Sequence, residues 1–421
     1  MQASPGQKLV DDAVGEFSAL MGDDLPGPLA AFYAHQRTRI SFWSRIEVTW
    51  NPGHRVTVRY RVMGEGGPLH GQRDVVAVAG GRPSGAFTVE SDDSAVEMWA
   101  VPDDPHLPGL RSALDRGAVT RLLADLGQKG AARHCRLRSY RPGRRGVVEV
   151  DADGASIYLK VVRPDRVEGL HRRHRLLTDD LSVPDSVGFD ADLGVVALQA
   201  LSGTDLRRAL RSGGQAIPEP IEIATVVDNL PEPPREWLGS SPVDHLPGVV
   251  DLLSKLVPDE ANRLRSMADS IGAGGEAPLI PIHGDFHEAQ IVVSPDGRLG
   301  LIDVDGYGWG SPTADPATML GHLHLLAPSS RSPRQTVDLA WALNRIWDRR
   351  VDPIALRLSV AAVILGLATG PFRVQSDAWV SETKERIGLS EEWIRSAEHL
   401  DERSLTVISR GSHGPTPGFS R

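Results

Sequence analysis

The chain has 421 residues, of which 40% are hydrophobic and 24% are charged, a composition typical of soluble proteins that bury an apolar core. At roughly 150 residues per domain, this length predicts two or three domains. The formal net charge of −9 argues against a nucleic-acid-binding protein, because that class usually carries a basic excess.

Three features of the sequence predict a cytoplasmic location. The N-terminal residues lack the basic start and the apolar run of a signal peptide. The longest apolar stretch, Leu358–Gly370, suits a buried core helix better than a membrane span. Cys135 is the only cysteine, so no intrachain disulfide can form and a reducing compartment is expected. We therefore expect a cytoplasmic protein, monomeric or homodimeric, with no membrane and no nucleic-acid partner.

The first 117 residues predict a small module of helix and antiparallel strands. Acidic and apolar positions alternate at helical spacing over residues 7–22. From Ile40 the period changes to two, through ISFWSRIEVTW and RVTVRYRVM, and the turn between these runs predicts a hairpin. Shorter strand patterns follow at residues 75–79, 86–89 and 96–101.

The next segment repeats this pattern. Residues 118–126 predict a helix, and CRLRSYRPGRRGVVEVDADGASIYLKVVRP predicts a further set of strands. Within it, YRPGRRGVVEV resembles the earlier WNPGHRVTVRYRV, with Pro142 and Gly143 taking the places of Pro52 and Gly53. The similarity between the two segments has two interpretations: an internal duplication, or the chance recurrence of Pro-Gly turns between basic strands.

The rest of the chain is predicted to be mostly helical. Helical spacing covers residues 167–177, a strand is expected at residues 195–199, and another helix begins at residues 205–210. Residues 218–247 contain seven prolines and little periodicity, which predicts a loop. The last residues, SRGSHGPTPGFSR, predict a disordered tail over 409–421.

The segment PIHGDFHEAQIVVSPDGRLGLIDVD, residues 281–305, carries most of the polar chemistry. Its centre, SPDG at residues 294–297, predicts a type I turn between two strands. If the first and last residues of the turn pair, Gln290 lies opposite Leu301 and diagonal to Asp303, roughly 7–8 Å away at the backbone. The side-chain oxygens of Gln290 and Asp303 would then converge on one cation, and Mg²⁺ prefers such hard ligands.

Asp285 precedes Gln290 by five residues and lies beside this predicted metal site rather than on it. A carboxylate at that position can accept a proton from an attacking hydroxyl group. The order Asp285, Gln290, Asp303 corresponds to the protein-kinase catalytic loop, in which an aspartate base is followed by an asparagine and then an aspartate that bind metal.

The motif HGDFHEAQ, with HGD in place of the kinase HRD, resembles the aminoglycoside phosphotransferase family, a small-molecule branch of the kinase fold. The stretch LIDVDGYGWGSPTADPATML extends the resemblance, which also covers the maltokinase and glucosamine-kinase branch, where glutamine can replace the asparagine ligand. The resemblance implies an α+β, bilobal, protein-kinase-like fold with an additional N-terminal α+β cap module. The implied domains are the cap (1–117), the nucleotide-binding N-lobe (118–200), the helical C-lobe (201–408) and the tail (409–421).

The resemblance also implies roles for single residues. Asp285 would be the catalytic base, His283 would brace its loop, and Asp315 would stabilise that loop from below. Gln290 and Asp303 would bind Mg²⁺. The resemblance leaves Asp305 with two roles, contact with a second metal ion or contact with the substrate.

A kinase-like fold also needs a strand lysine that holds the α- and β-phosphates of ATP. Lys160, at the end of SIYLKVV, is the candidate; the alternative is a solubilising residue on an edge strand. The partner glutamate on the following helix would be Glu168, although a solvated helix face is an equal interpretation. His174 occupies the later position at which the family has its glutamate, so His174 or an aspartate elsewhere is the other candidate partner.

The nucleotide lobe departs from the kinase pattern in one further respect. No G-x-G-x-x-G precedes Lys160, and RPGRRG over residues 141–146 takes its place, so that Arg144 and Arg145 are candidates to steer ATP or merely line a strand edge. By position, the hinge that meets adenine is Gln199, Ala200 and Leu201. The absence of a Walker A sequence argues against a P-loop fold.

These assignments predict an ATP- and Mg²⁺-dependent phosphotransferase that acts on a hydroxyl group of a small molecule. The acceptor stays open among sugars, amino sugars, aminoglycosides, other hydroxylated metabolites and a peptide hydroxyl. Residues 367–379, LATGPFRVQSDAW, are its candidate lining. A pseudokinase is the first alternative, since the helix glutamate and the asparagine ligand are both changed. A metallophosphoesterase is the second, because GDFH resembles that class, although no GNH segment accompanies it.

Overall fold

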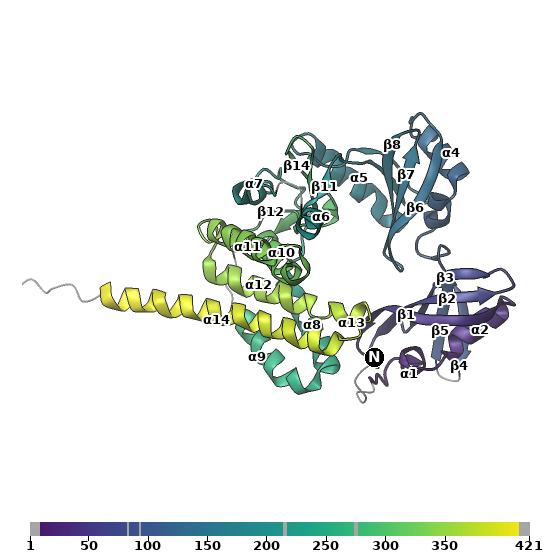
Figure 1. Cartoon of the computed structure of the whole chain (residues 1–421), viewed down its shortest axis with the longest axis horizontal. Helices are drawn as coiled ribbons and strands as arrows, with labels where there is room; N and C mark the ends of the chain where they lie inside the picture. Colours follow the sequence, from purple (N-terminus) through teal and green to yellow (C-terminus); the bar gives the residue numbers. More distant parts are fainter. Residues whose placement is uncertain (1–8, 82–83, 92–93, 214–216, 273–276, 412–421) are drawn as a thin grey trace, which may run out of the picture.

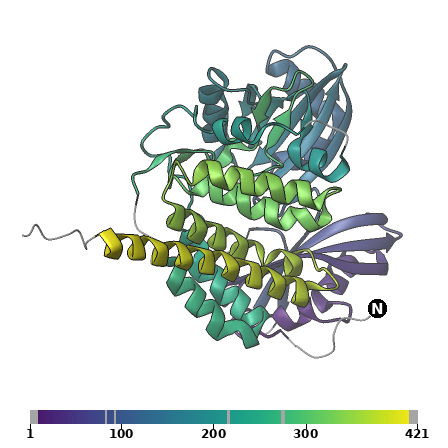
Figure 2. The same ribbon diagram turned by 60° about the vertical axis from the view of Figure 1, so that its left-hand side comes forward.

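The computed structural model describes residues 9–81, 84–91, 94–213, 217–272 and 277–411 (Figure 1). Two five-stranded antiparallel sheets lie at one side of the molecule, and a body of helices lies at the other (Figures 1 and 2). The architecture is therefore a mixture of helix and sheet, with the N-terminal module added to a sheet lobe and a helical lobe.

The first sheet has the strand order β1-β2-β3-β5-β4. Its strands are β1 (Arg39–Asn51), β2 (Arg55–Glu65), β3 (Gly71–Ala79), β4 (Phe87–Ser91) and β5 (Ser94–Ala100). Alternate residues of β2 are buried, as the period of two predicts. Gly53 turns the β1–β2 hairpin with a φ of 72°, a conformation that glycine adopts without strain. The predicted strands of this module are confirmed.

The predicted helix over residues 7–22 is mostly wrong. Residues 7 and 8 lie outside the described residues, and the helix α1 covers only Phe17–Met21, followed by α2 at Gly27–His35. Upstream of α1, the carboxylate of Asp11 accepts hydrogen bonds from Trp50 Nε1 and Gly53 N, both at 2.8 Å. These bonds tie the segment to the β1–β2 hairpin, and tertiary contact overrides the local helical pattern.

The second sheet has the same strand arrangement, β6-β7-β8-β10-β9. Its strands are β6 (Ala132–Arg141), β7 (Arg145–Ala152), β8 (Ala155–Val162), β9 (Ser186–Asp190) and β10 (Val195–Gln199). The helix α5 (Pro164–Thr178) connects β8 to β9, a position at which the first sheet has only a short connection. The shared strand order, together with a Pro-Gly turn after the first strand of each sheet, favours the duplication interpretation.

The outer face of the second sheet packs on the helices α3 (Gly109–Leu114) and α4 (Arg116–Asp125) and on one face of the first sheet. This shared core includes Val76, Trp99, Leu110, Leu123, Val148, Leu159 and Val161. Side chains alternate along β8, so Tyr158 and Lys160 point to the opposite, inner face. Since α3 packs on β6 to β8, the domain limit at residue 117 stays a prediction.

The first sheet also contacts the helical body. Arg45 Nε donates to Gln375 Oε1 at 2.8 Å, and Arg373 Nη1 pairs with Glu47 Oε1 at 3.0 Å. The rings of Trp50 and Phe372 lie 6.4 Å apart between their centroids. The N-terminal module therefore touches both the second sheet and the helices, as Figure 1 shows, and its function as a cap stays a prediction.

The helical body is built around α12, whose residues 356–365 are all buried. Its helices are α6 (Leu206–Ser212), α7 (Pro220–Thr225), α8 (Leu246–Leu256), α9 (Ala261–Gly272), α10 (Ala314–Leu326), α11 (Pro333–Trp347), α12 (Pro353–Leu367), α13 (Gly370–Arg373) and α14 (Trp379–Gly411). Short 3₁₀ turns are η1 (Pro242–His245), η2 (Pro258–Glu260), η3 (Val304–Gly306) and η4 (Ala327–Ser329). The predicted loop at 218–247 contains α7, η1 and the first two residues of α8. Of the tail predicted to be disordered, residues 409–411 belong instead to α14, and residues 412–421 lie outside the described residues.

Residues 353–373 are long and apolar enough to cross a membrane by length and composition alone. In the structure, 61% of their most apolar window is buried inside the molecule. This burial is what a core helix of a globular protein shows, and it supports the interpretation of this stretch as core. The cytoplasmic location stays a prediction.

Five short strands form the connection between the lobes: β11 (Thr204–Asp205), β12 (Ile280–Ile282), β13 (Ile291–Val293), β14 (Leu299–Leu301) and β15 (Gly308–Gly310). The predicted register of the β13–β14 hairpin is wrong by one residue, because Ile291 rather than Gln290 pairs with Leu301. The reason is Gly297, which has a φ of 84° and adds a third residue to the turn, so that Ser294 N bonds to Arg298 O at 2.9 Å.

Candidate active site

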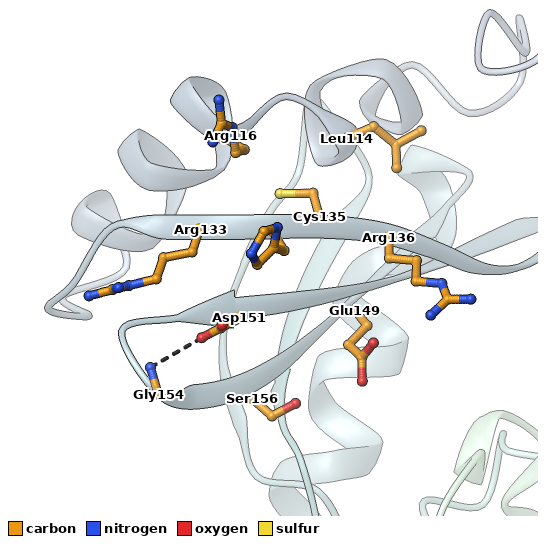
Figure 3. Close-up of a pocket in the computed structure, with 10 residues that line it drawn as sticks. Leu114, Arg116, Arg133, Cys135, Arg136, Glu149, Asp151, Gly154 and Ser156 are labelled. Atoms are coloured by element: carbon orange, nitrogen blue, oxygen red, sulfur yellow. Dashed lines mark hydrogen bonds between the residues drawn. The ribbon is translucent and has the colours of Figure 1, made fainter.

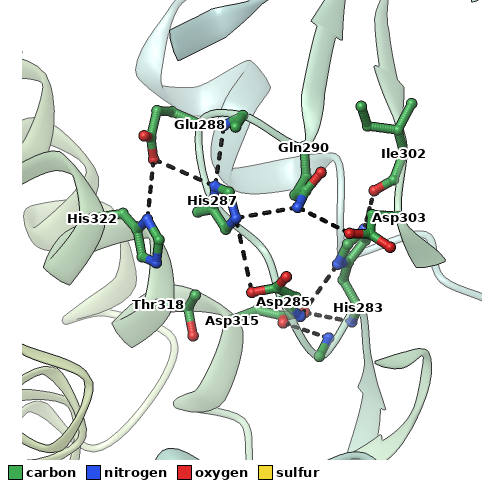
Figure 4. Close-up of polar contacts among 12 residues, drawn as sticks. His283, Asp285, His287, Glu288, Gln290, Ile302, Asp303, Asp315, Thr318 and His322 are labelled. Atoms are coloured by element: carbon green, nitrogen blue, oxygen red, sulfur yellow. Dashed lines mark hydrogen bonds and ion pairs between the residues drawn. The ribbon is translucent and has the colours of Figure 1, made fainter. Parts of the chain in front are cut away.

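The hairpin still brings Gln290 and Asp303 together. Ile302 N donates to Gln290 O at 2.9 Å, which continues the ladder beyond β13 and β14. Asp303 then takes a φ of 62°, and its carboxylate turns towards Gln290, whose Nε2 lies 3.5 Å from Asp303 Oδ2 (Figure 4). The amide nitrogen and oxygen of Gln290 exchange places by a flip of the terminal group, so either can face Asp303.

His283 is fully buried and connects two parts of this site. Its Nε2 bonds to the carbonyl oxygen of Ile302 at 3.1 Å, and its Nδ1 accepts a hydrogen bond from Asp285 N at 3.3 Å. These partners require a proton on Nε2 and none on Nδ1. The side chain therefore fixes the backbone on both sides of the hairpin, next to Asp285 and next to Asp303.

Asp315, at the start of α10, holds the loop that contains His283, Gly284 and Asp285 from the other side. Its carboxylate accepts hydrogen bonds from His283 N at 2.6 Å and from Gly284 N at 2.9 Å. Gly284 has a φ of 83°, and a Cβ there would lie 2.4 Å from Gly306 O, so the loop needs glycine at this position. Burial raises the pKa of Asp315, although His283 and the two N–H groups oppose this shift.

We expect Asp315→Ala to lower the free energy of unfolding by about 3 kcal/mol, because it leaves two buried N–H donors without an acceptor. Turnover should fall as well, since the loop that carries Asp285 loses its support. Denaturant titration measures the first effect. Asp338→Ala is the matched control: its side chain is 71% exposed on α11, and its loss should change the stability by less than about 0.5 kcal/mol. Equal stability of both variants would contradict the assigned support.

Asp285 has a half-exposed side chain in the cleft. Loss of water around its carboxylate, followed by repulsion from Asp303, raises its pKa to about 6, while His283, Arg141 and Arg145 oppose the rise. His287 Nε2 lies 3.8 Å from Asp285 Oδ1 (Figure 4). Burial lowers the pKa of His287 to about 2, so this imidazole is neutral. A carboxylate with a raised pKa that is still ionised at neutral pH has the properties of a general base.

Two cations of the second sheet bind the acidic pair. Lys160 Nζ pairs with Asp303 Oδ1 at 2.6 Å and also contacts Asp305. Arg145 forms a bidentate pair with Asp303, at 2.9 and 3.0 Å, and reaches Asp305 at 3.3 Å. Burial alone would raise the pKa of Asp303, but Lys160 and Arg145 outweigh it and hold the pKa well below its usual range. The site thus gathers cations around two carboxylates.

The structure does not bring Glu168 to Lys160. Glu168 is exposed on the first turns of α5, and the ion pairs of Lys160 go to Asp303 and Asp305 instead. The buried face of α5 carries His174, whose Nδ1 bonds to Pro184 O at 2.8 Å. Burial lowers the pKa of His174 to about 4; the bond to Pro184 O opposes this shift, and the nearby Lys160 contributes to it. The predicted role of Glu168 therefore has no geometric support.

The hinge residues differ in what they can offer a nucleotide. The backbone N–H of Gln199 donates to Asp185 O at 2.9 Å, and that of Ala200 donates to Ser156 O at 3.1 Å. Leu201 instead lines a cavity of about 390 Å³ between the hinge and the β13–β14 hairpin, together with Val292 and Gly300. Of the three predicted hinge residues, Leu201 is the one that lines this cavity.

Two functional candidates were underestimated or missed by the sequence analysis. Arg145 was only one of two basic turn residues, and nothing local distinguished it from Arg144, which is exposed. Tyr158 was not considered. The alternation along β8 places Tyr158 on the same face as Lys160, and that periodicity was a signal available in SIYLKVV.

A larger cavity lies away from these residues. It measures about 830 Å³ and surrounds the edge strand β6, where Arg133, Arg136 and Glu149 line it (Figure 3). In Figure 3, Cys135 and Arg116 lie on one side of β6, and Glu149 and Ser156 lie on the other. Its basic and acidic side chains are open to solvent, and it contains none of the motif residues.

Comparison with known proteins gives a family for the chain. A model of the phosphotransferase enzyme family matches residues 137–362, more than half of the sequence, and this range includes Lys160, Asp285 and Asp303. No curated protein matches. Among solved structures, macrolide 2′-phosphotransferase MphH from Brachybacterium faecium is 18% identical, with 64% of this chain and 97% of that chain covered and a TM-score of 0.42.

Two further structures are similar at comparable levels. Choline kinase LicA from Streptococcus pneumoniae is 13% identical over 66% of this chain and 98% of that chain, with a TM-score of 0.43. Spectinomycin phosphotransferase APH(9)-Ia is 10% identical over 68% and 98%, with a TM-score of 0.46. The predicted kinase-like family and fold are confirmed, whereas the maltokinase and glucosamine-kinase branch stays a prediction. By the extent of the family match, this chain belongs to the phosphotransferase enzyme family, the aminoglycoside phosphotransferase group of small-molecule kinases.

Proposed function

We propose that this phosphotransferase moves the γ-phosphoryl group of ATP to a hydroxyl group of a small molecule, with Asp285 as the general base. The observation that carries the proposal is a chain of contacts. Lys160 and Gln290 both meet Asp303, and His287 lies between Gln290 and Asp285, although Lys160 lies 143 residues from Asp303 in the sequence. A chance arrangement of turn residues does not require a buried lysine at that point.

Magnesium fits the donor set of this site. Asp303, Asp305 and the amide of Gln290 are hard oxygen donors, and Mg²⁺ prefers such ligands together with phosphate oxygens. The two carboxylates already form ion pairs with cations, namely Lys160 and Arg145. When bound, the ion would neutralise charge on the transferring phosphoryl group and orient it. We assign Asp303 and Gln290 as its ligands and Asp305 as an additional one.

Lys160 and Arg145 are the proposed phosphate ligands. Both come from the inner face of the second sheet, and both now pair with the carboxylates that we assign to the metal. Binding of the nucleotide would transfer these cations to phosphate oxygens, which also accept bidentate contacts from arginine. The adenine would contact Leu201, which lines the cavity at the hinge, and Tyr158, which lies on the same face of β8 as Lys160.

Asp285 then acts on the acceptor. Its carboxylate accepts the proton of the attacking hydroxyl group as the new O–P bond forms and the bond to the β-phosphate oxygen breaks, and ADP leaves. His283 and Asp315 hold the loop in place during this step. Since such transition states are loose, the contribution of the protein is mainly positioning and charge neutralisation.

A pseudokinase is the alternative that a specific observation favours. Glu168 is exposed, and His174 occupies the buried face of α5 on which a partner for Lys160 is expected. A protein of this type binds a nucleotide without transferring its phosphate. Against it stand Asp285 and Asp303, which the chain retains at the reactive end of the cleft.

The metallophosphoesterase alternative needs two metal sites about 3.5–4 Å apart. Within the described ranges, one group of histidine and acidic side chains has suitably close ligand atoms: His287, Glu288 and His322, within 4.8 Å of one another. Arg207 Nε donates to Glu288 at 2.7 Å and brings a fixed positive charge to that group. The cluster is therefore an ion-paired support of the loop rather than half of a two-metal centre.

The test is an ATP-consumption screen of the purified protein with Mg²⁺ against sugars, amino sugars and aminoglycosides. We expect ADP formation that depends on one acceptor class and disappears in Asp285→Ala. Tight nucleotide binding without acceptor-dependent ADP would support the pseudokinase. Hydrolysis of a phosphate ester without ATP would support the phosphoesterase.

A further inference from the structure

His287 has no part in the proposed function, although it lies between the proposed base and one of the proposed metal ligands. It is 7% exposed. Its Nε2 lies 3.2 Å from the terminal nitrogen of Gln290 and 3.8 Å from Asp285 Oδ1 (Figure 4). The position of the ring proton therefore decides what His287 offers to these two residues.

The other ring nitrogen of His287, Nδ1, faces two donors. Ala289 N donates to it at 3.2 Å, and Arg207 Nη2 lies 3.4 Å from it. A backbone N–H group and a guanidinium group can only donate, so Nδ1 has to present its lone pair. A neutral imidazole carries one proton, and this proton is then on Nε2. The tautomer of His287 is thus set on the side of the ring that faces away from Gln290.

Arg207, at the start of α6, is held in this place by Glu288. Its Nε donates to Glu288 Oε1 at 2.7 Å, and its backbone N–H donates to Glu288 O at 3.0 Å. The side chain of Glu288 is 1% exposed, so the carboxylate of this ion pair is shielded from solvent. Arg207 therefore keeps a fixed positive charge beside Nδ1 of His287, and a proton on Nδ1 would face that charge.

The plane of the imidazole is restricted as well. The ring of His322 on α10 stacks on the ring of His287, with the centroids 4.1 Å apart and an angle of 3° between the planes. The backbone adds to this restriction, because Gln290 N donates to His287 O at 2.9 Å. His287 is therefore the rigid partner in its contact with Gln290, and the amide of Gln290 has to adapt to it.

A proton on His287 Nε2 decides the orientation of the Gln290 amide. With the amide nitrogen toward His287, two N–H groups would face one another at 3.2 Å; with the amide oxygen there, the contact becomes a hydrogen bond. The same amide position lies 3.5 Å from Asp303 Oδ2. The amide oxygen then faces this carboxylate, an arrangement of two oxygen atoms that is favourable when a cation binds both.

The length of Gln290 explains why such a neighbour matters. Glutamine has one more rotatable bond than asparagine, so its amide has more orientations to lose when it binds a metal ion. A neighbour that accepts only one orientation removes part of this cost before the ion binds. Hydrogen-bond partners of metal ligands have this effect in many metal sites.

We infer that His287 is a positioning residue, which fixes the amide oxygen of Gln290 toward the metal site through its Nε2–H. Arg207 and Ala289 N–H select the tautomer that makes this possible. The inference rests on the proposed function, because it takes Gln290 as a ligand of Mg²⁺. It adds a residue that acts through Gln290 rather than on the metal ion.

The tautomer is measured directly by ¹⁵N NMR of the metal-free full chain with labelled histidine. We expect His287 to have a protonated Nε2 and an unprotonated Nδ1 at pH 7, with its signals assigned by their loss in His287→Gln. A proton on Nδ1, or exchange between comparable populations of the two forms, would overturn the inference. This readout requires neither metal nor turnover.

Two substitutions separate the positioning of Gln290 from support of the loop. His287→Asn keeps an acceptor for Ala289 N at the place of Nδ1, but it has no group that reaches Gln290. His287→Gln keeps an N–H donor at the place of Nε2. We expect His287→Asn to weaken Mg²⁺ binding about 10–100-fold, the usual effect of losing a partner of a metal ligand, and His287→Gln to weaken it less than about threefold.

Binding is measured by calorimetric titration of Mg²⁺ into the complex of the full chain with a non-hydrolysable ATP analogue. Thermal melting of each variant is the control for folding. The Mg²⁺ concentration that gives half-maximal ADP formation should follow the same order as the affinities. Equal Mg²⁺ affinity of the two variants would show that the Nε2–H of His287 has no part in the metal site.

The coupling between the two residues gives an independent readout. If His287 acts through Gln290, His287→Asn should change the Mg²⁺ affinity less than about twofold in a Gln290→Ala background. If the two substitutions are instead fully additive, His287 supports the loop without acting on the amide, and the inference is wrong.

These outcomes differ from those that test the proposed function. If the chain binds Mg²⁺ and the analogue but forms no acceptor-dependent ADP, the proposed kinase activity fails, and the tautomer and the affinities still decide the inference. If ADP forms but His287→Asn and His287→Gln bind Mg²⁺ equally well, the inference fails and the proposed function stands. A chain that binds no Mg²⁺ with the analogue would contradict both.

Discussion

Replacing Asp285 with alanine should lower kcat by roughly 10²–10⁴, the usual contribution of a general base. The carboxylate lies in a cleft where water is partly excluded and where Asp303 adds repulsion, and these two effects raise its pKa to about 6. A proton acceptor with that pKa is ionised at neutral pH and still binds a proton strongly. The side chain is half-exposed, and its one ion pair among the described residues, with His287, is 3.8 Å long, so its removal should leave the fold intact.

The measurement is steady-state ADP formation, with the thermal melting of both proteins as the control for folding. Asp285→Asn keeps the shape of the side chain and should lose the same activity. The wild-type kcat/KM should also fall about tenfold for each pH unit below pH 6, since only the ionised form accepts a proton. Near-normal turnover in Asp285→Ala would remove the assigned base and with it the proposed mechanism.

Local patterns in the sequence were sufficient for most of the strands. Alternation of apolar and polar residues is a property of neighbouring positions, and it gave β1, β2 and β8 nearly as they are. The register of the β13–β14 hairpin was not readable in this way. It depends on whether Gly297 joins the turn with a positive φ, and SPDG is compatible with both turns.

Long-range pairing decided the rest of the site. Lys160 was identified because a kinase-like fold needs a lysine on a strand before the catalytic segment. Its contact with Asp303, however, depends on how the second sheet packs against the β13–β14 hairpin. Arg145 and Arg144 are indistinguishable in RPGRRG, and only the strand phase of β7 turns Arg145 inward. The expected contact between Glu168 and Lys160 is absent for a related reason. The buried face of α5 runs from Val167 through His174, and this leaves Glu168 on the solvent side.

After Asp285, Asp303 should be the position at which substitution lowers activity most. Its substitution should reduce kcat/KM more than the substitution of Gln290 does. Asp303 carries the charge that attracts a divalent ion, whereas Gln290 offers one neutral oxygen. We expect Asp303→Asn to reduce kcat/KM by roughly 10²–10⁴, in line with the several kcal/mol that a metal ion contributes to transition-state stabilisation. Gln290→Ala should cost about tenfold.

The measurement is a titration of activity with Mg²⁺ at saturating ATP. In Gln290→Ala, a higher Mg²⁺ concentration should restore most of the rate, because the charged ligand remains. In Asp303→Asn it should not. Asp303→Asn also removes one carboxylate from Lys160, which is 5% exposed, but Asp305 still pairs with that lysine, so the fold should persist.

Gln290→Asn, the shorter amide, is the conservative control and should retain activity. If Gln290→Ala is as inactive as Asp303→Asn and insensitive to Mg²⁺, the amide does more than complete the metal site, and the division of roles between the two ends of the hairpin is wrong.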